Sequence, residues 1–447
     1  MELDMTKGSP IKLIIKFSIP VILGNLFQQL YNLADTMIVG RFLGVEALAA
    51  VGATGTLVFL ILGFVQGITT GFTVVTAQYF GAGDKEGMKR SIAGAVFLSV
   101  IVTVLVTTIA MAGIGPLLKL IKTPQEIYNM ELTYMLIICA GIFTNVIYNL
   151  QASLLRSIGN SVMPLIMLIV SSGINIVLDY ILIVFGHMGV AGAALATVIA
   201  QAISGMLCFV YILKCIPTLH MKKNDWGIHR YITTRQLQIG VPMALQFSIT
   251  AIGGIMVQSA LNMFGATVIA AYSVTRKIEM LFTTSFDSMG VTMATYCAQN
   301  IGKNDIGRVR KGVHSAEVML FSYAVIVYIV LYALLPFMLG LFVQGDINDI
   351  LGYARTYIII NGAFYIPLAM IFIFRNAMQG CGYSILPMMG GVVELISRCI
   401  LAVVATKLVS YEGVCMANAA AWFSAGVFLM FAYLHMLKKR KKQGAAT

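Results

Sequence analysis

The chain has 447 residues, of which 59% are hydrophobic and only 11% are charged, and its formal net charge is +12. Ordinary soluble domains contain about 25% charged residues, so this composition excludes them. Nucleic-acid binding is also excluded as the reason for the positive charge, because the basic residues gather in short segments between long apolar stretches, as membrane topology requires.

Twelve apolar stretches recur along the chain, each long enough for the about 20 residues that a helix needs to cross the hydrocarbon core. They cover residues 17–39, 48–80, 91–114, 132–155, 162–185, 189–213, 239–264, 268–298, 313–343, 356–380, 384–409 and 413–437. We therefore predict an all-α membrane protein with twelve transmembrane helices.

The first span contains a single carboxylate, Asp35, where a charge is costly unless it faces a wet cavity, a partner or a bound cation. Asn25, Gln28 and Asn32 precede it at intervals of three or four residues. Helical geometry places all four side chains on one face, and lipid cannot satisfy their hydrogen bonds. Pro20 lies about four turns before Asp35 and removes a backbone hydrogen bond, which permits bending.

The fifth and sixth spans carry a second polar stripe. Asn175 and Asp179 lie four residues apart in the fifth span, and Thr197 and Gln201 have the same spacing in the sixth. Counted from the predicted outer ends, Asp35, Asp179 and Thr197 lie at a similar depth of roughly 6 to 12 Å, at 1.5 Å per residue. Two acids, an amide and a hydroxyl at one level suit either a small cation such as Na⁺ or a carboxylate pair that takes up a proton.

The second half has a different set of polar residues. Glu394 and Arg398 form an i, i+4 pair, and Arg276 precedes Glu279 by three residues; such self-neutralising pairs are more often structural. Further polar side chains within the spans are candidates for a substrate cavity: Gln28, Asn32, Asn145, Asn149, Gln201, Gln246 and Asp287.

The chain repeats itself on either side of its long polar interval. "FSIPVILGNLF" from Phe17 matches "IGVPMALQFSI" from Ile239, and "AQYFGAGDK" matches "AQNIGKNDI". "LLRSIGNSVMP" matches "AMQGCGYSILP", and "GVAGAALA" matches "GVCMANAA", in the same order. We predict an N-lobe over residues 1–213, a basic linker over 214–238, a C-lobe over 239–437 and a basic tail over 438–447. Because each half has six spans, the copies are parallel repeats, an organisation common in transporters.

Basic residues predict the orientation of the spans. With the N-terminus inside, 21 Lys and Arg residues fall on the inner side and five fall on the outer side: Arg41, Lys119, Lys122, Arg355 and Lys407. Basic loops face the cytoplasm. Both termini are therefore expected to be cytoplasmic, in a multi-pass protein of the plasma membrane.

The motifs "LADTMIVGRFLG", "AQYFGAGD", "NIVLDYILI" and "GVAGAALAT" resemble those of multidrug and toxic compound extrusion (MATE) transporters, and the resemblance extends over both halves. It implies two six-helix lobes in a V and the export of organic cations in exchange for protons or sodium ions. In the prokaryotic branch with an N-lobe cation site, the matching positions are Asp35, Asn175, Asp179 and Thr197, and the bending proline of the first helix matches Pro20. The acid that another bacterial branch has in span seven is absent here.

The functional expectation is an antiporter that exports organic, cationic compounds, acting as a monomer in the lipid bilayer without a cofactor other than the coupling ion, H⁺ or Na⁺. A flippase for a lipid-linked oligosaccharide is the alternative within the same superfamily. A membrane-embedded enzyme is a third possibility, but the acids have no His or Ser partner beside them and no catalytic motif occurs, so no enzymatic activity is expected.

Overall fold

The computed structural model describes residues 2–121, 123–342 and 347–444. Lys122 and residues 445–447, which the sequence placed on the outer side and in the tail, lie outside the described residues, as do the side chains of Lys441 and Lys442. The described residues contain helices and no strands. This confirms the all-α prediction.

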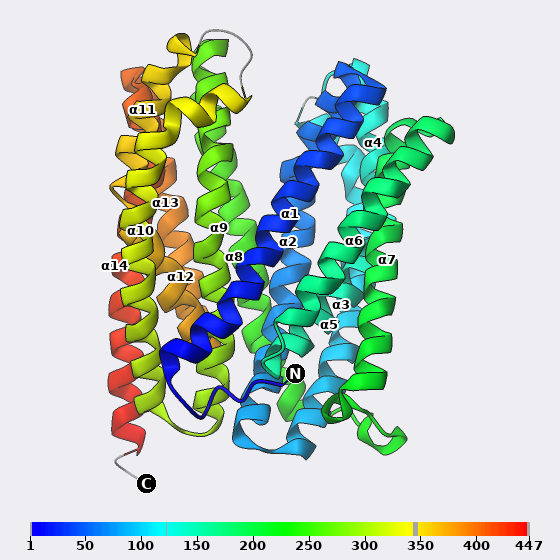
Figure 1. Ribbon diagram of the computed structural model, residues 1–447, viewed down its shortest axis with the longest axis vertical. Helices are drawn as coiled ribbons and strands as arrows, with labels where there is room; N and C mark the ends of the chain where they lie inside the picture. Colours follow the sequence, from blue (N-terminus) through cyan, green and yellow to red (C-terminus); the bar gives the residue numbers. More distant parts are fainter. Residues whose placement is uncertain (1, 122, 343–346, 445–447) are drawn as a thin grey trace. The chain divides into compact units, whose positions relative to one another are not determined.

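The helices fall into two compact units, which are described separately. Unit 1 contains residues 2–4 and Ile19–Ser248, and unit 2 contains Met5–Ser18 and the described residues after 248. The first seven α-helices are α1 (Pro10–Leu43), α2 (Val45–Ala82), α3 (Lys85–Leu120), α4 (Gln125–Ala140), α5 (Ile142–Ser157), α6 (Val162–Tyr180) and α7 (Gly189–Cys215) (Figure 1). The remaining seven are α8 (Arg230–Leu261), α9 (Ala266–Gly302), α10 (Ile306–Phe342), α11 (Asn348–Gly362), α12 (Tyr365–Gly380), α13 (Ile385–Leu408) and α14 (Tyr411–Gly444).

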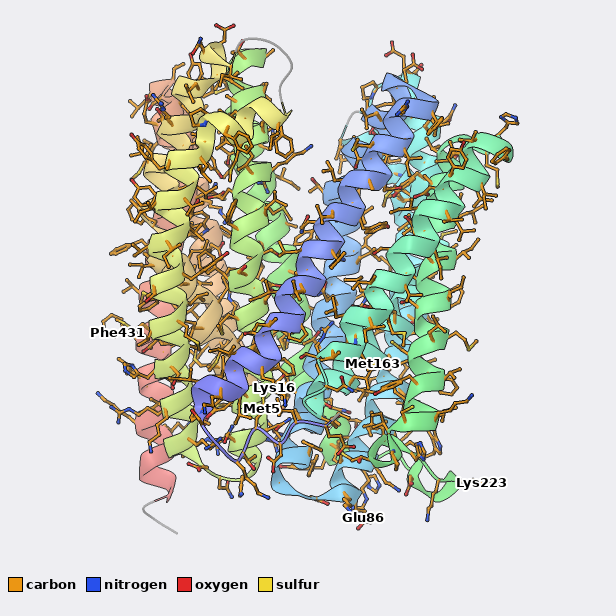
Figure 2. All side chains as sticks on the ribbon, viewed as in Figure 1. Met5, Lys16, Glu86, Met163, Lys223 and Phe431 are labelled. Atoms are coloured by element: carbon orange, nitrogen blue, oxygen red, sulfur yellow. The ribbon has the colours of Figure 1, made fainter. Side chains whose placement is uncertain are left out.

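Each predicted span coincides with one helix or with a bent pair of helices. Among the described residues, nine helices are long and apolar enough to cross a membrane, and the count reaches eleven when each bent pair is one span. The remaining predicted span corresponds to α9, along which Arg276, Lys277, Glu279 and Asp287 lie. Large apolar side chains such as Ile109, which is 69% exposed, cover the outside of the helices, as a lipid-facing surface requires. Phe431 projects from α14 in the same way (Figure 2).

The internal repeat is confirmed in three dimensions. The pair α4 and α5 bends by 48°, and so does the pair α11 and α12. The residues that follow α4 and α11 are Gly141 and Ala363, which occupy equivalent positions of the repeat. The two halves therefore share a broken helix that the sequence showed as one continuous apolar stretch.

The repeated motifs form the turns between helices. Asp84 caps α3 by accepting a hydrogen bond from the Gly87 N–H at 2.8 Å, and Asp305 accepts one from the Arg308 N–H at 2.8 Å at the start of α10. A carboxylate at this position satisfies an N–H that the helix leaves free. The two repeats therefore share these aspartates because of their structural role as caps.

A third repeated motif uses glycine where the chain leaves a helix. Gly159 has φ of +83° and Gly382 has φ of +87°, in the left-handed region that other residues rarely adopt. The next residues, Asn160 and Tyr383, each donate a backbone hydrogen bond five residues back, to Leu155 and Met378, at 2.9 Å. This is the Schellman arrangement, which ends both helices in the same way.

The first helix of each repeat belongs to both units. In unit 2, the backbone N–H of Met5 donates to Gln299 Oε1 at 2.8 Å, and Asn300 Nδ2 donates to the Met5 carbonyl at 3.2 Å. In unit 1, Arg235 at the start of α8 donates to Gln78 Oε1 at 2.7 Å. Gln78 and Gln299 are the same glutamine of the repeated "AQ" motif. Consequently α1 starts in unit 2 and continues in unit 1, whereas α8 starts in unit 1 and continues in unit 2.

Candidate functional site

The site is built in unit 1 from α1, α6 and α7. Asn175 and Asp179 lie one turn apart on α6 and are 1% and 0% exposed. In the orientation that satisfies both ends of its amide, Asn175 donates to Asp179 Oδ2 at 2.9 Å and accepts from the Thr197 backbone N–H at 3.2 Å. The Asn175 side chain thus connects α6 to α7 and holds the Asp179 carboxyl group in place.

Asp35 of α1 completes the group. Its carboxyl group lies close enough to the Asp179 carboxyl group for the two to interact. Two carboxylates at close range repel each other, which favours the protonated form of one of them. The Oδ1 atom of each group is buried and has no hydrogen-bond partner. The arrangement can therefore hold one proton between the two acids and still has two oxygen atoms free to accept.

Two tyrosines that the sequence analysis did not select belong to the same surroundings. The Tyr31 hydroxyl lies near the Thr197 side chain and near the Asp35 carboxyl group. Tyr134 of α4 is 8% exposed and interacts with both acids. Tyr31 precedes Asp35 by four residues, and this helical spacing could have predicted that the two side chains are neighbours. Tyr134 lies on a different helix, so no spacing along the chain relates it to the acids.

The backbone changes form directly beyond the acids. α6 ends at Tyr180, and the π-helix η1 (Ile181–Phe185) follows at once. π-Helical turns are rare and are found frequently at functional sites. η1 contributes Ile183 to a buried apolar cluster that also contains Val39, Tyr134 and Val190, one residue from each of three other helices.

The other predicted site residues are placed elsewhere. Gln28 and Asn32 are exposed on α1, and Gln201 is half-buried on α7. Asn149 Nδ2 donates to Asn145 Oδ1 at 2.9 Å, one turn away within α5. Gln246 is buried in the part of α8 that belongs to unit 1, whereas Asp287 lies in α9 of unit 2.

The structure describes Pro20 inside a continuous α1, two residues after the helix passes from unit 2 to unit 1. Proline removes the N–H that would bond to the carbonyl group one turn earlier. The position at which α1 changes units is therefore also a weak point in its hydrogen-bond ladder.

A sodium ion here would be held by the two carboxylates together with neutral oxygens. The Asn175 amide oxygen accepts from the Thr197 backbone N–H at 3.2 Å. The Thr197 hydroxyl donates to the Ala193 carbonyl at 3.1 Å, so its oxygen lone pairs are available to a cation.

Known proteins are similar to this chain over most of its length. The MatE family model matches residues 20–181 and again 242–404, so each repeat matches separately. A probable multidrug resistance protein of Bacillus subtilis, YpnP, is 26% identical over 384 residues, which cover 85% of this chain and 84% of that protein.

Solved structures agree in fold. An outward-facing conformation of a multidrug resistance MATE family transporter of the MOP superfamily matches with a TM-score of 0.91 and 23% identity, covering 98% of each chain. A MATE crystal structure in the bent conformation matches with a TM-score of 0.90 and 24% identity, covering 99% of this chain and 98% of that one. Since the family model matches both repeats, this multi-pass membrane protein belongs to the MatE family.

Proposed function

We propose that the protein is a secondary multidrug efflux antiporter that exports organic cations in exchange for protons, with Asp35 and Asp179 as the coupling pair. The observation that carries the proposal is the proximity of the Asp35 and Asp179 carboxyl groups, whose Oδ1 atoms are buried without hydrogen-bond partners. Two acids at close range favour the uptake of a proton by one of them. Asn175 positions Asp179 of the pair through its contacts with that carboxyl group and with the Thr197 backbone N–H. Membership of the MatE family and similarity to a multidrug resistance protein support the efflux activity.

Coupling follows from competition for the same carboxyl oxygens. With the pair deprotonated, two negative charges at one level attract an organic cation. With the pair protonated, that attraction weakens and the cation is released. A proton and a substrate that prefer different conformations of the protein become linked through the equilibrium between those conformations. Bending of α1 near Pro20 would be the accompanying movement, since Pro20 interrupts the ladder where α1 changes units.

The proposal also covers location, oligomeric state and domain organisation. We propose a plasma-membrane protein that has both termini in the cytoplasm and acts as a monomer. Residues 1–213 form its N-lobe and residues 239–437 its C-lobe. Gln28, Asn32, Asn145, Asn149, Gln201, Gln246 and Asp287 remain proposed contacts for substrates. The comparisons do not favour the lipid-linked oligosaccharide flippase considered above, because the two relatives cited here are a probable multidrug resistance protein and a multidrug resistance MATE family transporter.

The decisive experiment uses the purified protein in proteoliposomes that contain an organic cationic dye. Dye transport is measured with a pH gradient alone and then with a sodium gradient alone. We expect the pH gradient to drive transport and the Asp35→Asn variant to lose it, because an amide cannot take up a proton. Asp349→Asn, at an exposed position, is the matched control and should transport normally. Undiminished transport by Asp35→Asn would refute the proposed role of Asp35, and transport driven only by sodium would replace the proton with Na⁺.

A further inference from the structure

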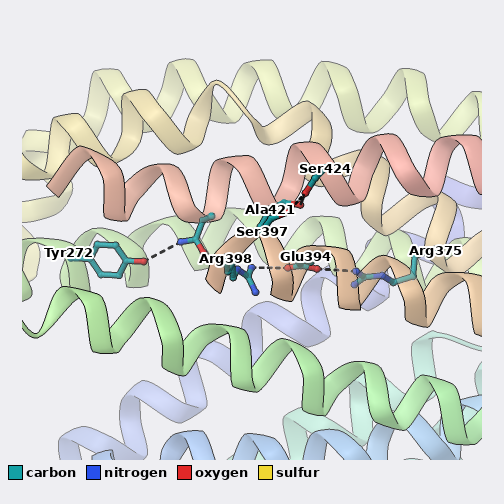
Figure 3. A network of polar contacts seen from close by, with 8 residues as sticks. Tyr272, Arg375, Glu394, Ser397, Arg398, Ala421 and Ser424 are labelled. Carbon is teal, nitrogen blue, oxygen red and sulfur yellow. Dashed lines mark hydrogen bonds and ion pairs between the residues drawn. The ribbon is translucent and has the colours of Figure 1, made fainter. Parts of the chain in front are cut away.

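Some buried polar side chains of unit 2 are held by ion pairs or by hydrogen bonds. Arg375 Nη2 donates to Glu394 Oε2 at 3.1 Å, and Arg398 Nη2 donates to Glu394 Oε1 at 2.7 Å (Figure 3). The predicted i, i+4 pair of Glu394 and Arg398 therefore exists, and α12 adds a second arginine to it. Glu279 accepts hydrogen bonds from two tyrosine hydroxyls, at 2.5 Å and 2.9 Å. A further buried group in this unit consists of two cysteines and a tyrosine.

Cys297 of α9 and Cys381, which directly follows α12, form a close pair. Both are free cysteines, they are 0% and 2% exposed, and their thiol groups lie close enough to interact. The backbones also meet beside them, because a Cβ atom added to Gly380 would lie 3.1 Å from Ala298 N. Gly380 precedes Cys381, and Ala298 follows Cys297. A disulfide needs Cα atoms about 4.4 to 6.8 Å apart, and this close approach of the two backbones permits one.

The other repeat packs the same positions without cysteine. The repeated motifs align Thr76 with Cys297 and Ile158 with Cys381. Thr76 Oγ1 accepts a hydrogen bond from the Ser91 hydroxyl at 2.9 Å, and Ile158 is 0% exposed within an apolar cluster. Packing at these positions therefore does not require sulfur. The need to fill space does not explain why two thiols meet in unit 2.

A buried tyrosine beside the two cysteines lacks a hydrogen-bond partner. Tyr433 of α14 is 4% exposed, its hydroxyl group has no partner, and it lies near both thiols. Its ring is stacked on Phe374, with 5.3 Å between the ring centroids, which fixes its position. A buried hydroxyl without a partner is costly. An oxygen atom added to either sulfur would give this hydroxyl an acceptor.

We propose that Cys297 and Cys381 form an oxidisable dithiol, which hydrogen peroxide converts into a disulfide between α9 and the end of α12. First, one thiol loses its proton and its sulfur attacks a peroxide oxygen. The O–O bond breaks, the sulfur becomes a sulfenic acid, and the released hydroxide takes up the thiol proton to form water. The Tyr433 hydroxyl donates a hydrogen bond to the new sulfenic oxygen.

The second step closes the disulfide. The sulfur of the remaining thiol attacks the sulfenic sulfur, an S–S bond forms and the S–O bond breaks. The leaving oxygen departs as water with the proton of the second thiol. In total the two thiols lose two electrons and two protons, and one peroxide molecule is reduced to two water molecules.

The location of the pair suits a response to oxidants in the cell. Cys297 lies in the last two turns of α9, and Cys381 lies at the end of α12. With both termini in the cytoplasm, as proposed above, these helix ends lie on the cytoplasmic side, where thiols are kept reduced. Burial disfavours the thiolate and slows the first step, so sustained exposure to peroxide is needed. The cross-link then closes a long loop and stabilises the packing of α9 on α12.

The test uses the purified full-length protein in detergent, incubated with hydrogen peroxide. Free thiols are then blocked with iodoacetamide under denaturing conditions, and a digest made without reductant is analysed by mass spectrometry. We expect a linked peptide pair that contains Cys297 and Cys381, is lighter by two hydrogen atoms than the sum of its parts, and is separated by dithiothreitol. The oxidised protein should also unfold at a higher temperature than the reduced protein, because the cross-link restricts the unfolded chain.

Three variants separate this pair from the other cysteines. Cys297→Thr introduces the residue of the other repeat, and it should form no link and show no oxidation-dependent change in unfolding temperature. Cys415→Ser, at a buried cysteine of the same unit, is the matched control and should form the link as the unmodified protein does. Tyr433→Phe should slow the formation of the link by about fivefold, as the loss of one ordinary hydrogen bond predicts.

Several outcomes would overturn the proposal. One is the absence of the linked pair at peroxide concentrations that oxidise the exposed Cys215. Another is a link that joins Cys297 or Cys381 to a different cysteine, or equal unfolding temperatures of the oxidised and reduced protein. An unchanged rate for Tyr433→Phe would remove the tyrosine from the mechanism. Because neither transport nor an ion gradient enters these measurements, their outcome is independent of the proposed efflux function.

Discussion

Replacing Gly71 with alanine would place a methyl group inside the contact between α2 and the first part of α8. A Cβ atom at position 71 would lie 2.4 Å from Gly240 Cα and 2.9 Å from Gly240 N. Carbon atoms in favourable contact are about 3.5 to 4.0 Å apart. Both neighbouring atoms belong to the backbone and cannot rotate away, so the two helices must separate by about 1 Å.

The expected loss of stability is set by two opposing effects. Overpacking of this kind costs about 1 to 3 kcal/mol, and alanine recovers about 1 kcal/mol through its higher helix propensity. Because the obstruction is backbone, we expect Gly71→Ala to lower the free energy of unfolding by about 1 to 2 kcal/mol. Gly55 lies on the same helix, and a Cβ atom added there would meet nothing within 4 Å, so Gly55→Ala should gain up to about 1 kcal/mol.

Both variants and the unmodified protein are heated in the same detergent, and their thermal unfolding is monitored by size-exclusion chromatography of the heated samples. Gly71→Ala should unfold at a lower temperature than the unmodified protein, and Gly55→Ala at an equal or higher one. If Gly71→Ala were as stable as Gly55→Ala, the close packing of α2 on α8 would not be a source of stability.

Three further predictions concern polar contacts. Glu394→Gln leaves two buried arginines without their carboxylate and should destabilise the protein by about 3 to 5 kcal/mol, measured by the same thermal assay. Tyr365→Phe removes one of two hydroxyl donors to buried Glu279 and should cost about 1 to 3 kcal/mol; no loss of thermal stability would show that this hydrogen bond is dispensable. The Asp225 carboxylate accepts a hydrogen bond from Lys89 at 2.8 Å, and this contact holds the pKa of Asp225 below its ordinary value. The contact should therefore stabilise the folded protein slightly and fully at pH values above the ordinary pKa of aspartate. This stabilisation should disappear as the pH falls through the lowered pKa of Asp225. Unfolding temperatures of Asp225→Asn and the unmodified protein across this acidic range should converge at the low end.

The sequence predicted those features that depend on neighbours along the chain. Helical spacing and depth brought Asp35, Asn175, Asp179 and Thr197 together, because residues four apart on a helix share a face and spans of known direction share levels. The repeat was visible because each half must form the same turns, with an aspartate or a glycine at fixed positions.

Features that depend on contacts between separate helices were not predictable in this way. Arg375 lies inside a predicted span, but nothing along the chain paired it with Glu394, which is 19 residues away on the next helix. Tyr134 joins the surroundings of the acids only through the folding of α4. The bend at Gly141 was hidden because both arms of the broken helix are apolar, and a span of uniform composition does not reveal where its axis changes direction.

The membership of α1 and α8 in both units bears on the origin of the molecule. A single-repeat ancestor could place the start of its first helix on another unit only by associating with a second copy of itself, as in a domain-swapped homodimer. Joining two such copies by a linker would convert that exchange between subunits into an exchange within one chain. Within one chain the two copies can differ in sequence, and here one half contains a pair of acids and the other a pair of arginines.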